Sequence, residues 1–82
     1  MRLDKYLKVS RLIKRRTVAY EACDNERVTV NGKAARASYE VKEGDVIGIR
    51  FGQRTLTVEV VSVAENAGKA EAAAMYREVD RP

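Results

Sequence analysis

Residues 27–33, with the sequence RVTVNGK, mark the point where the chain changes from a helical to an extended pattern. The valines of this stretch alternate with polar residues, which is typical of a half-buried strand. Asn31-Gly32 then predicts a type I′ hairpin, because both central residues of that turn need a positive φ. We therefore expect a β-hairpin, with a short return strand over residues 33–37.

The chain after this hairpin keeps an extended pattern. Residues 46–51 and 55–63 are rich in β-branched residues and predict two further strands, joined by a tight connection at Gly52-Gln53. The alanine- and glutamate-rich residues 69–76 predict a last short helix, because these residues favour helix. The polar tail, residues 77–82, is expected to be frayed.

The chain before the hairpin has helical spacing. Leu3, Tyr6 and Leu7 recur at i, i+3 and i+4 and predict a helix over residues 2–9. The basic residues 10–16 are less periodic and indicate a turn that carries cations.

A second helix is expected after that turn. Thr17 is a suitable N-cap, and Asn25 is suited to the left-handed conformation that ends many helices. The apolar side of this helix is expected to consist of Val18, Ala19, Ala22 and Cys23. Cys23 is therefore interpreted as a small core residue. The resulting fold class is α+β, with two N-terminal helices packed on a small, mostly antiparallel sheet and a short C-terminal helix.

The charge of the chain is unevenly distributed. The net charge is +4, and residues 1–36 hold ten Lys or Arg against four Asp or Glu, so this part carries +6 and the rest −2. Seven cations lie within the first sixteen residues, with Asp4 as the one acid: Arg2, Lys5, Lys8, Arg11, Lys14, Arg15 and Arg16. Such a cluster indicates a polyanionic partner, above all nucleic acid. The alternative is a solvated basic face with no partner.

Several classes of protein are disfavoured by composition. The 82 residues include one cysteine and no histidine, so we expect no metal site, no cofactor and no enzymatic activity. No apolar run approaches the ~20 residues that span a bilayer, and no signal-peptide core follows the basic N-terminus. We expect no membrane partner and a cytoplasmic location.

Four motifs resemble the S4 RNA-binding domain, in the same order and with the same spacing. They are RLDKYL at residues 2–7, RTVA at 16–19, RVTVNG at 27–32 and VKEGDVI at 41–47. The resemblance implies an RNA-binding domain over residues 1–65, followed by a C-terminal helix and tail over residues 66–82. Many such domains have glycine where this chain has Glu26, so Asn25 is expected to take the left-handed position instead.

The whole chain resembles a short stand-alone branch, the RqcP family of bacterial ribosome-associated quality-control proteins. The resemblance lies in residues 1–17, in RFGQ at 50–53 and in AMY at 74–76. It implies a non-enzymatic protein, expected to be monomeric, that binds obstructed large ribosomal subunits. Its partners would be large-subunit rRNA and peptidyl-tRNA, and it would support alanine tailing by the factor RqcH.

The resemblance also implies which side chains contact RNA. Arg2 and Arg16 match the basic positions tied to RNA contact, whereas Leu3 and Leu7 would pack in the core. The full expected set is Arg2, Lys5, Arg11, Lys14, Arg15 and Arg16, with Lys33 and Arg36 at its edge. Two alternatives stay open: a recycling factor like the related fifteen-kilodalton heat-shock protein, and an accessory module that binds proteins through its sheet.

Overall fold

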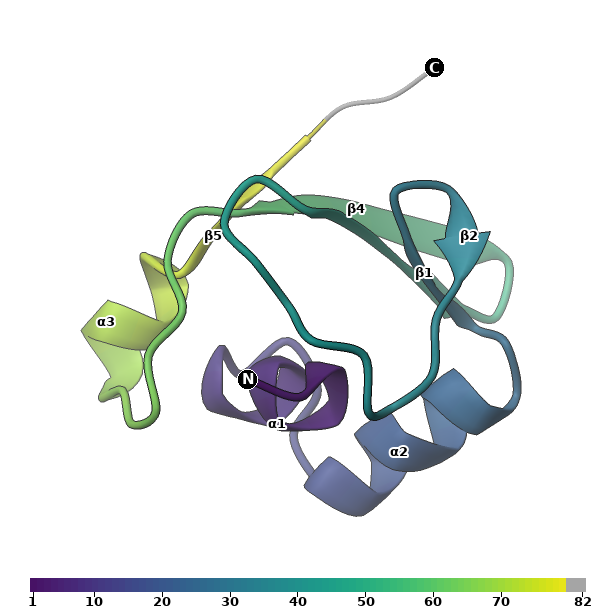
Figure 1. The fold of residues 1–82 in the computed structure, drawn as a ribbon, viewed down its shortest axis with the longest axis horizontal. Coiled ribbons are helices and arrows are strands. Elements are labelled where there is room, and N and C mark those ends of the chain that lie inside the picture. Colours follow the sequence, from purple (N-terminus) through teal and green to yellow (C-terminus); the bar gives the residue numbers. More distant parts are fainter. Residues whose placement is uncertain (80–82) are drawn as a thin grey trace.

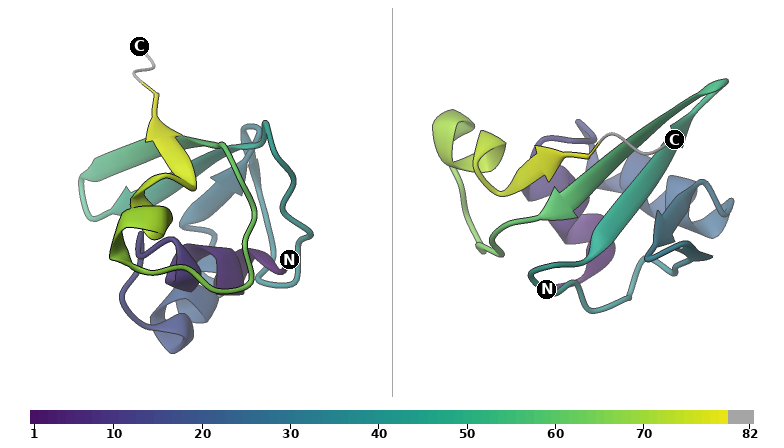
Figure 2. Two further views of the ribbon diagram at one scale, coloured as in Figure 1. Left: turned by 90° about the vertical axis from the view of Figure 1, so that its left-hand side faces the viewer. Right: turned by 90° about the horizontal axis from the view of Figure 1, so that it is seen from above.

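The computed structural model describes residues 1–79 and confirms the predicted α+β class. Its elements, in chain order, are α1 (Leu3–Val9), α2 (Arg16–Asp24), β1 (Val28–Val30), β2 (Lys33–Ala34), β3 (Val46–Phe51), β4 (Arg54–Val60), α3 (Lys69–Ala73) and β5 (Tyr76–Glu78). The strands form one antiparallel sheet in the order β2-β1-β3-β4-β5. Helices α1 and α2 lie together on one face of this sheet (Figures 1 and 2).

The core lies between that sheet face and the two helices. Alternate residues of β3 and β4 point inward, as the period of two requires, and Ile47 and Val58 are fully buried. From α1, the predicted stripe of Leu3, Tyr6 and Leu7 is also fully buried. This confirms the packing role of both leucines and fixes which face of α1 remains in solvent.

The β1–β2 hairpin has the predicted turn. Asn31 and Gly32 have φ values of 53° and 87°, as a type I′ turn requires. The return strand, however, ends at Ala34 and not at residue 37. The chain leaves the sheet there because the Leu3 N–H donates to the Tyr39 carbonyl at 2.8 Å and the Asp4 N–H to the Ala37 carbonyl at 3.2 Å. These bonds draw residues 35–39 toward the start of α1.

The end of α2 corrects the prediction for Asn25. Asn25 has φ −91°, and Glu26, one residue later, takes the left-handed conformation with φ 59°. The Glu26 N–H donates to the Cys23 carbonyl, and the Arg27 N–H donates to the Ala22 carbonyl. This pair of bonds is a Schellman motif, in which the left-handed residue follows the C-cap and is not the C-cap itself.

The start of α2 also differs from expectation. The helix begins at Arg16, after an extended Arg15, with no side-chain cap hydrogen bond, so Thr17 is not the N-cap. Val18 is 49% exposed, and the buried side of the helix is formed by Ala19 and Cys23. Burial raises the pKa of the Cys23 thiol to about 11, as suits an inert core cysteine.

The C-terminal part contains a strand that the sequence pattern did not predict. α3 ends at Ala73, and Tyr76 begins β5, which pairs with β4 in the register Val60↔Tyr76 and Val58↔Glu78. Since the chain beyond Val60 turns to bond with Met75, β4 ends three residues earlier than predicted. The prediction of a frayed tail is therefore wrong for residues 77–78. The last three residues of that tail, 80–82, lie outside the described part of the chain. Within residues 1–79, no helix is long and apolar enough to cross a membrane.

Candidate nucleic-acid interface

The centre of the basic face is a buried carboxylate. Asp4 in the first turn of α1 is 3% exposed. Its Oδ1 accepts hydrogen bonds from Arg2 Nε at 3.1 Å and from the Lys5 backbone N–H at 2.8 Å. Its Oδ2 accepts a hydrogen bond from Arg16 Nε at 3.3 Å. One carboxylate thus holds two arginines that are fourteen positions apart in the chain: Arg2 directly precedes α1, and Arg16 begins α2.

The ionisation of Asp4 follows from these contacts. Burial by itself raises the pKa of a carboxyl group, because it disfavours the charged form. The hydrogen bonds from Arg2, Arg16 and the Lys5 N–H outweigh burial, so the pKa of Asp4 lies below its ordinary value of 3.8. Asp4 is therefore a carboxylate at neutral pH and serves as a fixed anionic anchor for the two guanidinium groups.

Both arginines keep much of their donor capacity for a ligand. The side chains of Arg2 and Arg16 are 48% and 47% exposed. Arg16 uses Nε for Asp4, and no hydrogen bond from the described residues engages its two terminal nitrogens. A guanidinium held by Nε presents its outer N–H groups in a fixed fork, which matches the geometry of a phosphate.

The turn between α1 and α2 adds further cations. Arg11 has φ 64°, and this left-handed residue reverses the chain after α1. Arg11, Lys14 and Arg15 are exposed, and none forms an ion pair with another residue of the described chain. Lys5 differs from this group, because it is half-buried and paired with Glu65.

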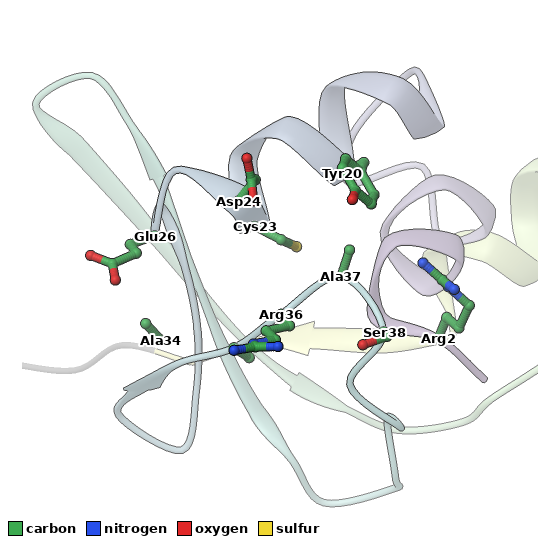
Figure 3. Close-up of a pocket in the computed structure, with 10 residues that line it drawn as sticks. Arg2, Tyr20, Cys23, Asp24, Glu26, Ala34, Arg36, Ala37 and Ser38 are labelled. Carbon is green, nitrogen blue, oxygen red and sulfur yellow. The ribbon is translucent and has the colours of Figure 1, made fainter.

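Two predicted cations beyond the helices lie next to this face. Arg36 and Arg2 line the same groove, which has a volume of about 480 Å³ and separates α2 from residues 34–38 (Figure 3). Lys33 and Arg36 line a second hollow, together with Val30 and Tyr39. The bonds of the N-terminus to residues 37–41 produce this arrangement, including one from the Val41 N–H to the Met1 carbonyl.

The groove includes residues that the sequence analysis did not select. Tyr20 on α2 is 51% exposed and lines it, together with Asp24 and Glu26. The sequence did offer one signal for Tyr20, because it is a large aromatic residue that lies outside the apolar side of its helix. Among residues 1–79, no three potential metal ligands gather in one place.

The fold and this basic helical face define the class of protein. The family model described as the S4 domain matches residues 1–47, and the chain belongs to this family. A protein of Halalkalibacterium halodurans named RQC P-site tRNA stabilizing factor is 59% identical over 76 residues, which cover 93% of this chain and 86% of that protein. A Bacillus subtilis protein of the same name is 55% identical over 93% of this chain and 88% of its own length. Among solved structures, the trimeric heat shock protein 15 of Vibrio cholerae has a TM-score of 0.89 at 32% identity, covering 96% of this chain and 81% of that one.

Proposed function

We propose that this protein binds structured RNA through the face centred on Arg2 and Arg16. The observation that carries the proposal is the buried Asp4 carboxylate, which holds both guanidinium groups while leaving them half exposed. Anchored arginines lose less conformational freedom when they grip a phosphate than free ones do. The remaining residues of the proposed RNA-binding set are Lys5, Arg11, Lys14, Arg15, Lys33 and Arg36.

The name shared by the two bacterial relatives described above supports a more specific role. We propose that the protein binds peptidyl-tRNA in the P site of an obstructed large ribosomal subunit and also contacts the rRNA. In this role it acts in the cytoplasm as a monomer without catalysis, and it supports alanine tailing of the nascent chain by RqcH. Residues 1–65 are the RNA-binding domain, and residues 66–82 are an extension that completes the sheet with β5.

A recycling factor for dropped-off large subunits is the second candidate. It is favoured by the close similarity to the V. cholerae heat shock protein 15. The two roles differ in their product, because a recycling factor would release the nascent chain without extending it.

Sedimentation of tagged protein from a bacterial lysate tests the proposal. We expect the protein to migrate with free large subunits that carry peptidyl-tRNA, and to leave them as salt rises, since phosphate contacts are screened. Deletion of its gene should remove alanine tails from stalled chains. Protein that stays at the top of the gradient at low salt would refute the ribosomal role, and unchanged tails would favour recycling.

Asp4→Asn distinguishes RNA binding through an anchored pair of arginines from binding through positive charge alone. The substitution raises the net charge by one, so charge alone predicts tighter RNA binding. We expect several-fold weaker binding instead, because both guanidinium groups lose their ionic acceptor, and a loss of about 1–3 kcal/mol in the free energy of unfolding. Glu78→Gln is the matched control, since it changes the charge equally at an exposed carboxylate of the edge strand β5 that forms no ion pair within the described chain. Fluorescence anisotropy with labelled tRNA measures both variants, and equal affinities would contradict the anchoring role.

The same substitution should change the response of stability to acid. Because the pKa of Asp4 is lower in the folded protein, the unfolded chain takes up a proton first as the pH falls through 3.8. The folded state of the wild type therefore loses stability in this range. Urea titrations of Asp4→Asn between pH 6 and 3, a range around the ordinary carboxyl pKa, should give a flatter profile.

A further inference from the structure

The groove beside the arginine pair has walls of different chemistry. Tyr20, Cys23 and Asp24 line it from α2, and residues 34–38 line it from the opposite side (Figure 3). Its floor is made of small residues, with Cys23 and Ala37 buried, so the space is not filled by side chains. A volume of about 480 Å³ lies within the usual range of small-molecule sites, roughly 300–1,000 Å³.

Charge along the groove is mixed, and this limits what it can hold. Arg2 stands at one end and Glu26 at the other, with Arg36 and Asp24 between them on opposite walls (Figure 3). Neither Asp24 nor Glu26 forms a side-chain hydrogen bond or ion pair with any residue of the described chain. A purely anionic ligand would be repelled by these carboxylates, and a purely cationic one by the arginines. The occupant must therefore carry both an anionic group and hydrogen-bond donors.

The exposed ring of Tyr20 adds a stacking surface to the charged groups of the groove. It is 51% exposed on the rim of the groove, where an aromatic face can stack on a flat ligand. Proteins that recognise RNA commonly stack unpaired bases on aromatic side chains and read their edges by hydrogen bonds. A nucleotide has an anionic phosphate, a flat base and, in cytosine, adenine and guanine, an exocyclic amino group.

We propose that this groove takes one unpaired nucleotide of the bound RNA whose base carries an exocyclic amino group. The phosphate lies on Arg2 and Arg36, continuous with the Arg2–Arg16 pair. The base stacks on Tyr20, and its amino group donates to Asp24 or Glu26, as carboxylates accept from the cytosine N4 amino group. The inference rests on the proposed RNA-binding function and adds base selectivity to it.

The test uses two labelled RNA stem-loops that are identical except that the unpaired loop nucleotides are all cytidine or all uridine. Uridine replaces the amino donor of cytidine with a carbonyl acceptor. We expect wild-type protein to bind the cytidine loop on the order of tenfold more tightly. Tyr20→Ala should weaken binding to the cytidine loop by on the order of tenfold, whereas Tyr20→Phe should retain it.

The double variant Asp24→Asn with Glu26→Gln tests the edge contact separately. It adds two positive charges, so electrostatics alone predicts tighter binding to both loops, whereas loss of the cytidine preference supports the proposal. All these side chains are exposed, and thermal unfolding checks that each variant is folded.

Arg16→Ala distinguishes failure of the groove proposal from failure of the proposed RNA-binding function. If Arg16→Ala loses binding to both RNAs, the RNA-binding function stands. The groove proposal is then overturned by either of two results: wild type binds both loops equally, or Tyr20→Ala binds the cytidine loop like wild type. If Arg16→Ala also binds both RNAs like wild type, the proposed RNA-binding face itself is wrong.

Discussion

Arg16→Ala is expected to weaken the binding of structured RNA by ten- to a hundredfold and to reduce the salt dependence of binding by about one counterion. Arg16 is held by Asp4 through Nε, so its two terminal nitrogens stay available as a fixed fork for a phosphate. Removing it deletes a charge-assisted contact and leaves the buried carboxylate with Arg2 as its one cationic partner. Anisotropy titrations with labelled tRNA at several salt concentrations measure both effects.

Two controls make this prediction specific. Arg54→Ala removes the same charge from the exposed start of β4, outside the proposed face, and should change the affinity about twofold or less. Arg16→Lys keeps the charge but loses the fork, so an intermediate affinity is expected. If Arg16→Ala and Arg54→Ala had equal effects, binding would depend on diffuse positive charge and not on the anchored pair.

Tyr6→Ala is expected to have the largest effect on folding. Tyr6 is fully buried on α1, and its hydroxyl donates to the Met75 carbonyl at 2.8 Å. Burial, with a smaller contribution from Tyr76, raises the pKa of Tyr6 above its ordinary value, so the hydroxyl keeps its proton and remains a donor. Truncation should cost about 3–5 kcal/mol, a large share of the 5–15 kcal/mol that stabilises a typical domain. Urea unfolding followed by circular dichroism measures the loss.

Tyr6→Phe distinguishes the ring from the hydroxyl. The Met75 carbonyl also accepts hydrogen bonds from the Val61 N–H at 2.8 Å and the Ser62 N–H at 3.0 Å. It therefore keeps partners when the hydroxyl is removed, and we expect a cost of about 1 kcal/mol. If Tyr6→Ala unfolded at the same urea concentration as wild type, the packing of α1 against the C-terminal segment would not contribute to stability.

Elements with a strong local signal could be predicted from the sequence. The stripe of Leu3, Tyr6 and Leu7 predicted α1, and Asn31-Gly32 predicted the hairpin turn, because each depends on the conformational preferences of neighbouring residues. Composition and charge order indicated where the basic surface lies. The family and its α+β fold followed from four motifs in the first 51 residues, which the family model for residues 1–47 confirms.

Contacts between distant segments could not be read in this way. β5 is a three-residue strand, Tyr-Arg-Glu, which is too short and too polar to show a strand pattern in the sequence. Its extended conformation depends on pairing with β4. The shared hydrogen bonds of Asp4 with Arg2 and Arg16, and the groove that Arg2 forms with Tyr20 and residues 34–38, arise from how α1, α2 and that segment pack. The sequence by itself determined the helices, the hairpin and the amount of positive charge, because these depend on residues close together in the chain. Only the tertiary structure decided which cations share an anchor and which residues face the groove, because packing brings together side chains that are far apart in the sequence.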